Sequence, residues 1–159
     1  MVLLLDIDGV MVAANSWRKL EILNDGFPAF TAMATNSLNR ILAETQPRII
    51  LTTSHKHKYS TDQWIKLFHN RNVKLDELSC LPENKTNLNR RDEIQHYLSQ
   101  THLNKNFVII DDDKSLNALP KKVKDRLVQT SSSVGLTDYL ADEVIDKLKA
   151  ADSNPNTIS

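Results

Sequence analysis

The stretch that decides the fold stands at the start of the chain, where residues 2–10 read Val-Leu-Leu-Leu-Asp-Ile-Asp-Gly-Val. Its four consecutive apolar residues are typical of a strand that is buried on both faces of a sheet. Two carboxylates, Asp6 and Asp8, follow this strand directly, and Gly9 permits a tight turn after them. Parallel sheets of this kind bind ligands beyond the carboxyl ends of their strands. The two aspartates are therefore the first candidate site residues.

Strands and helices alternate along the rest of the chain. Apolar runs predict further strands over 48–52, 72–78, 107–110 and 126–129. Helical spacing of apolar residues predicts helices over 30–44, 61–70, 91–99 and 137–148, with a short helix near 17–23. This order predicts an α/β fold of three-layer, Rossmann-like type, in which helices cover both faces of a mostly parallel central sheet. We expect one domain over residues 1–149 and a flexible C-terminal tail over 150–159.

The composition excludes several classes of protein. With 159 residues, the chain has room for one domain of ordinary size. Its 20 basic and 20 acidic residues balance, which argues against binding nucleic acid through bulk charge alone. The single cysteine, Cys80, excludes an internal disulfide framework and fits a reducing compartment. Because the apolar runs are also too short to span a bilayer, we expect a cytoplasmic protein.

Polar side chains also follow the other buried strands. The residues concerned are Thr52, Thr53 and Ser54 after the second strand, Lys85 and Arg90 before the third main helix, and Asp111, Asp112 and Asp113 after the strand 107–110. Carboxylates from two strand ends suit a hard cation, most naturally Mg²⁺. Hydroxyls and a basic side chain supply the hydrogen-bond donors and positive charge that a phosphoryl group needs. The pattern predicts a phosphoryl-transfer site at one edge of the sheet.

In this order, the residues resemble the four motifs of phosphatases in the haloacid dehalogenase (HAD) superfamily. The first motif is matched by residues 6–10, the second by Thr52, the third by Lys85, and the fourth by Asp111 and Asp112. The resemblance spans roughly residues 2–140. Each motif alone is weakly specific, but their common order at the ends of predicted strands is strongly specific.

The resemblance implies a mechanism for hydrolysis of a phosphomonoester. Asp6 would be the nucleophile that forms an aspartyl-phosphate, and Asp8 would be the general acid and base. Mg²⁺ would lie between Asp6, the backbone carbonyl of Asp8 and Asp111, with Asp112 holding its surroundings. Thr52 and Lys85 would bind the phosphoryl oxygens. Alternatives remain open at three positions: Thr53 or Ser54 for Thr52, Arg90 for Lys85, and Asp113 for Asp112.

The intervals between the motifs bear on the substrate. Neither has room for a cap domain, and in this superfamily an open site goes with large substrates such as nucleic-acid ends or phosphoproteins. Residues 54–55, 90–94 and 135–137 resemble the small HAD domains associated with RNA repair, which are similar to the phosphatase half of polynucleotide kinase-phosphatases. RNA or DNA ends are therefore the predicted substrate, with a repair kinase or ligase as partner.

Three further residues are candidate contacts to such a substrate. His55 and Lys56 lie in a basic loop that could bind a nucleic-acid backbone or be merely solvated. Trp17 could stack on a base, with core packing as its alternative. The competing functions are a phosphatase for small metabolites or nucleotides, a protein phosphatase, and a non-catalytic module that binds phosphate.

Overall fold

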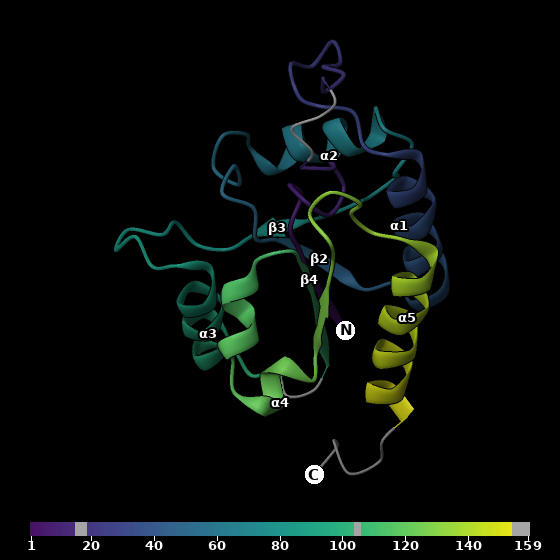
Figure 1. The fold of residues 1–159 in the computed structure, drawn as a ribbon. Helices are drawn as coiled ribbons and strands as arrows, with labels where there is room; N and C mark the ends of the chain where they lie inside the picture. The colour runs from purple at the N-terminus through teal and green to yellow at the C-terminus, as the bar shows by residue number, and fades with distance from the viewer. Residues whose placement is uncertain (15–18, 104–105, 154–159) are drawn as a thin grey trace.

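The computed structural model describes residues 1–14, 19–103 and 106–153. Its centre is a sheet of five parallel strands in the order β3-β2-β1-β4-β5 (Figure 1). The strands are β1 (Val2–Leu5), β2 (Arg48–Leu51), β3 (Ser79–Cys80), β4 (Phe107–Asp111) and β5 (Leu127–Gln129). Helices flank this sheet, so the predicted three-layer α/β fold with a parallel central sheet is confirmed.

The register of the three central strands aligns their carboxyl ends. β1 lies between β2 and β4, and Leu5 pairs with both Leu51 and Ile110. The residues that follow these three positions are Asp6, Thr52 and Asp111. The sheet therefore brings the predicted first, second and fourth motifs to one edge.

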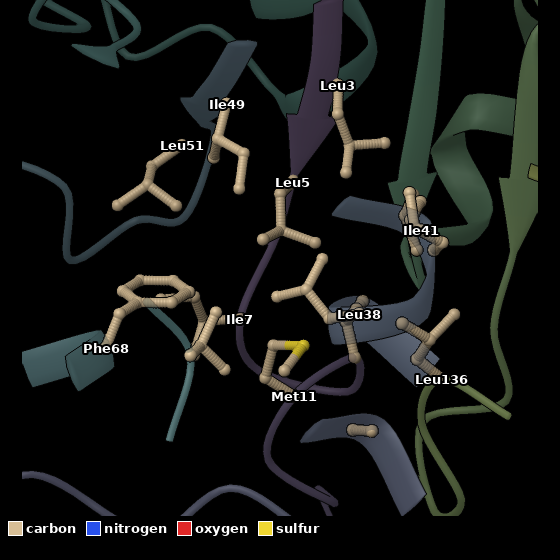
Figure 2. Close-up of a cluster of buried hydrophobic side chains, with 14 of the residues drawn as sticks. Leu3, Leu5, Ile7, Met11, Leu38, Ile41, Ile49, Leu51, Phe68 and Leu136 are labelled. Atoms are coloured by element: carbon tan, nitrogen blue, oxygen red, sulfur yellow. The ribbon is translucent and has the colours of Figure 1, made fainter. Parts of the chain in front are cut away.

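Helices cover the sheet on both faces (Figure 1). They are α1 (Ala32–Thr45), α2 (Thr61–His69), α3 (Arg90–Gln100), the 3₁₀ helix η1 (Lys114–Ala118), α4 (Lys121–Lys124) and α5 (Asp138–Ser153). Side chains of α1 and α2 pack in one core with alternate strand residues such as Leu3 and Leu5 (Figure 2). Side chains of α5 belong to the same core. Side chains of α3 and η1 pack in the second core with Val2 and Leu4. Burial on both faces explains why β1 is apolar at every position.

Side-chain caps fix where three helices begin. Thr31 caps α1, Ser60 forms a capping box with Gln63 at α2, and the Asn89 side chain accepts a hydrogen bond from the Asp92 backbone at α3. Each cap of this kind contributes about 1 kcal/mol. The cap at Asn89 has a direct consequence for the site, because it makes Arg90 the first residue of α3.

The third strand was predicted in the wrong place. Residues 72–78 do not form a strand, and the two-residue strand Ser79–Cys80 follows them instead. Asn72 has a φ of 63°, in the left-handed region that interrupts an extended run. Val73 and Leu75 are nevertheless buried in the core, so the alternation in the sequence reflects an irregular segment that packs its apolar residues inward.

The elements near the two ends also differ from expectation. The described residues 19–23 are not helical, and Ile22 instead forms an antiparallel bridge to Pro28. The last helix continues to Ser153 and so overlaps the expected tail, whereas 154–159 lie outside the described residues. Trp17 also lies outside them.

A buried arginine ties the loop after β1 to the α2 side of the molecule. The Arg71 guanidinium donates hydrogen bonds to both carboxylate oxygens of Asp25 and to the backbone carbonyls of Phe27, Pro28 and Leu67. It also lies over the rings of Phe27 and Phe30. Residues 25–30 of this loop are therefore packed against the core, whereas Leu20 and Ile22 are exposed. The described residues contain no large cap domain. None of the helices in the described ranges has the length and apolar character needed to cross a membrane.

Candidate active site

Three side chains converge at the carboxyl edge of the central strands. Asp6 is buried, and its backbone N–H donates to the Ile110 carbonyl, while the Thr52 N–H donates to the Leu5 carbonyl. The Thr52 hydroxyl and the Asp111 Oδ2 atom are buried without a hydrogen-bond partner in the described structure. Unsatisfied buried polar atoms are costly, and both residues follow strand positions that pair with Leu5, which is where a parallel sheet binds a polar ligand.

A group of carboxylates at this edge has the geometry of a cation site. Asp6, Asp111 and Asp112 each offer an oxygen, and these three atoms all lie within 4.8 Å of one another. Oxygen donors of this kind suit Mg²⁺, whose ligands in proteins are mainly carboxylates, carbonyls and water. The residues present therefore fit the metal that the sequence predicted. Asp113 lies differently, because its carboxylate accepts from the Ser115 N–H at the start of η1.

The electrostatics of the metal-free site are unfavourable to charged carboxylates. Burial raises the pKa of Asp6, and the neighbouring Asp111 carboxylate raises it further, whereas the Arg90 guanidinium acts in the opposite direction. Burial likewise raises the pKa of Asp111, against the lowering effect of Arg90. A bound cation would favour the charged forms and relieve this repulsion.

Of the two candidates for the third motif, the structure places Arg90 beside the acidic cluster. Its Nη2 atom lies 3.7 Å from Asp6 Oδ1 and its Nε atom 3.6 Å from Asp111 Oδ2. Lys85 is exposed and lines a cavity of about 390 Å³ between residues 81–88 and α3. The capped start of α3 thus brings a guanidinium, and not the Lys85 ammonium, close to Asp6 and Asp111.

The loop after β2 holds the other predicted residues in different surroundings. The Thr52 hydroxyl has no hydrogen-bond partner, whereas the Thr53 hydroxyl accepts from the His55 backbone N–H. Ser54 is exposed. Of the three hydroxyls, the one on Thr52 is therefore both buried at the strand end and without a hydrogen-bond partner in the described structure.

Asp8 and His55 contact each other on the solvent-exposed side of the site. His55 Nε2 lies 2.9 Å from Asp8 Oδ2, and both side chains are about half exposed. The His55 ring packs edge to face against the ring of the buried Phe27, with 6.0 Å between the ring centroids. A half-exposed carboxylate beside a buried one is suited to exchanging protons with a substrate and with water.

Lys56 lies inside the protein rather than on an exposed basic loop. Its Nζ atom is 2.8 Å from Glu93 Oε2, and its side chain is only 6% exposed. Glu93, which sequence reasoning missed, also faces Arg90 across one turn of α3. The signal available in the sequence was the spacing of Arg90 and Glu93, since residues three apart share one face of a helix.

Gly9 allows the loop after β1 to pass close to the acidic cluster. Its φ is +79°, and a Cβ atom built there would lie 2.0 Å from Asp112 Oδ2. The Gly9 carbonyl accepts from the buried Thr130 hydroxyl, while Ser132 donates to Asp112. The loop and the residues after β5 thus fix Asp112 from two sides.

Replacing Gly9 by alanine should therefore disturb the proposed metal site. We expect Gly9→Ala to displace Asp112 and to weaken Mg²⁺ binding at least about tenfold, as changes around metal ligands commonly do. Gly26→Ala is the matched control, because Gly26 has a similar φ of +81° but no atom within 4 Å of its built Cβ. Calorimetric Mg²⁺ titration of both variants measures the difference. Equal affinities would show that Asp112 has no part in the site.

The raised pKa of Asp6 predicts a pH-dependent stability of the metal-free protein. Its pKa rises from 3.8 to about 8 on folding, so above pH 4 the unfolded chain binds fewer protons than the folded one. The free energy of unfolding should therefore fall as pH rises from about 4 to about 8, by at most about 1.4 kcal/mol per pH unit from this group. In Asp6→Asn the decline should be shallower. Urea unfolding of both proteins in EDTA tests this, and parallel curves would contradict it.

The family of this α/β domain is shown by comparison with known proteins. A family model described as "HAD domain in Swiss Army Knife RNA repair proteins" matches residues 2–141. The chain belongs to this family. It is also similar to the solved structure of a HAD superfamily (subfamily III A) hydrolase from Legionella pneumophila, with 18% identity and a TM-score of 0.46 over 95% of this chain and 85% of the other. The comparison with curated proteins finds no match.

Proposed function

We propose that this chain is a Mg²⁺-dependent phosphomonoester hydrolase that acts through an aspartyl-phosphate on Asp6. The observation that carries the proposal is the juxtaposition of Asp6 with the Arg90 guanidinium and the unpaired Thr52 hydroxyl at one sheet edge. A nucleophile, a positive charge and a hydrogen-bond donor are what transfer of a phosphoryl group to a carboxylate requires. Membership of the HAD family supports a hydrolase of the phosphatase type.

In the first step, a carboxylate oxygen of Asp6 forms a bond to phosphorus as the bond from phosphorus to the leaving oxygen breaks. Asp8 gives its proton to that leaving oxygen. In the second step, the Asp8 carboxylate takes a proton from water as the water oxygen bonds to phosphorus. The bond between Asp6 and phosphorus then breaks, which releases phosphate and restores the free carboxylate.

Other side chains bind the phosphoryl group, position Asp8 and hold the metal ion. Arg90 and the Thr52 hydroxyl bind the phosphoryl oxygens, and His55 holds Asp8 at 2.9 Å. Asp6, Asp111, Asp112 and the backbone carbonyl of Asp8 would hold Mg²⁺. When bound, the ion offsets repulsion between the anionic nucleophile and the anionic phosphoryl group.

The proposed substrate is the phosphorylated end of a nucleic acid, with RNA favoured over DNA. The family description, which names RNA repair proteins, supports this choice. The absence of a large cap from the described residues supports a large substrate, since nothing there closes over Asp8. A repair kinase or ligase is the proposed partner, and the cytoplasm, where Cys80 would stay reduced, is the proposed compartment.

The test is a phosphate-release assay on four substrates: oligonucleotides with a 3′-phosphate, oligonucleotides with a 5′-phosphate, free nucleotides and a phosphopeptide. We expect release from an oligonucleotide end, its loss in EDTA and its return with Mg²⁺. Release from free nucleotides alone would indicate a small-molecule phosphatase, and preference for the phosphopeptide a protein phosphatase. Binding of phosphate without release from any substrate would contradict an enzymatic role.

A further inference from the structure

We propose that Lys56 and Glu93 form a buried positioning pair that sets how much of the Arg90 charge is available to a phosphoryl group. This inference rests on the proposed function, because it concerns the same site. It assigns a role to two buried charges that the reaction itself does not use.

The contacts of Glu93 divide its two oxygens between two cations. Oε2 lies 2.8 Å from Lys56 Nζ, and Oε1 lies 3.6 Å from Arg90 Nη1. The Lys56, Glu93 and Arg90 side chains are 6%, 11% and 13% exposed. Solvent screens an ion pair only weakly in such surroundings. How closely Glu93 approaches Lys56 therefore strongly affects how strongly it attracts Arg90.

Arg90 is held loosely by its anionic neighbours. Its three guanidinium nitrogens face Asp6, Asp111 and Glu93 at 3.6–3.7 Å, which is longer than a hydrogen bond. The buried Nη1 atom has no hydrogen-bond partner in the described structure. No hydrogen bond among these contacts therefore fixes the guanidinium, and a shift of it toward Glu93 would move its Nη2 and Nε atoms away from Asp6 and Asp111.

Lys56 is the residue that keeps Glu93 from doing so. Its backbone carbonyl accepts a hydrogen bond from the buried Trp64 indole, which fixes the loop after β2 at this point. From there the ammonium reaches Glu93 at 2.8 Å, about 0.8 Å closer than the approach of Arg90. With Lys56 replaced by an uncharged residue, the buried Glu93 carboxylate would be left with Arg90 as its remaining cation among these contacts. It would then draw the guanidinium away from Asp6.

The decisive experiment compares single and double variants by calorimetric titration with inorganic phosphate in the presence of Mg²⁺. Lys56→Met should weaken phosphate binding about tenfold, because the hydrogen bonds at stake involve charged groups. Adding Glu93→Gln to Lys56→Met should recover most of the lost affinity, since no carboxylate then competes for Arg90. Lys56→Arg should bind phosphate nearly as tightly as the wild type. Lys58→Met, which removes an exposed charge from the same loop, is the matched control.

A merely structural role predicts a different pattern. In that case the double variant would bind phosphate no better than Lys56→Met, and thermal unfolding alone would change; this outcome overturns the inference. In active variants, the loss should appear in KM more than in kcat. If the wild type hydrolyses a phosphomonoester and Lys56→Met binds phosphate as tightly as the wild type does, the inference fails and the proposed function stands. If the wild type does neither, both fail.

Discussion

Asp6→Asn should abolish phosphate release, with kcat lower by roughly 10⁴-fold or more, because an amide oxygen is a poor nucleophile and the covalent route is closed. The substitution keeps the shape of a side chain that is 6% exposed, and it removes a carboxylate whose pKa burial has raised. Phosphate release measured beside the wild type, with thermal unfolding to confirm folding, gives the result.

The control for Asp6→Asn is Asp113→Asn. Asp113 belongs to the acidic triplet after β4 but caps η1 and lies outside the cation cluster. The variant should keep both the cap, because asparagine caps a helix about as well as aspartate does, and nearly all of the activity. An Asp6→Asn protein that still hydrolyses phosphomonoesters at a tenth of the wild-type rate would contradict the assignment of the nucleophile.

Asp8→Asn should lower kcat by roughly 10²–10⁴-fold on substrates with a poor leaving group, because these depend most on a proton from a general acid. On an aryl phosphate with an acidic phenol, the loss in the first step should be much smaller. The half-exposed position of Asp8 and its contact with His55 place this carboxyl on the solvent-exposed side of the site. The ratio of kcat values for nucleotide and nitrophenyl phosphates in both proteins measures the effect.

His55→Gln, which can still donate a hydrogen bond to Asp8, serves as the comparison for this experiment. It should retain more activity than Asp8→Asn on every substrate, since the general acid remains. The comparison requires that transfer of the phosphoryl group to Asp6 limits kcat for both substrates. If Asp8→Asn then lowers kcat equally on both, Asp8 does not protonate the leaving oxygen.

The sequence predicted the parts of the fold in which pattern and burial agree. The apolar run of β1 needs a sheet covered on both faces, and the polar residues after β1, β2 and β4 align because neighbouring parallel strands end together. For that reason Asp6, Thr52 and Asp111 could be placed at one edge without a structure. The strand predicted over 72–78 was wrong because an irregular segment can also bury apolar residues at alternate positions.

The contacts of the basic residues in the site could not be predicted, because they depend on the direction in which each side chain points rather than on spacing in the sequence. Lys85 precedes α3 and Arg90 is its first residue, and only the cap at Asn89 and the direction of the helix show which of the two side chains reaches the acidic cluster. Lys56 looked like part of a solvated loop because its neighbours are polar, whereas its side chain turns inward to Glu93. A buried ion pair between distant segments leaves no periodic signal in the sequence.

The most direct test of the central claim is to look for the phosphoryl group on Asp6. Protein quenched in acid during turnover and digested should yield a phosphorylated peptide that contains Asp6, and hydroxylamine should remove the label, as it does from acyl phosphates. Asp6→Asn should yield none. A phosphoryl group on another residue would contradict the account. So would turnover by the Asp8→Asn protein, in which hydrolysis of the aspartyl-phosphate is slowed, with no phosphorylated protein at any quench time.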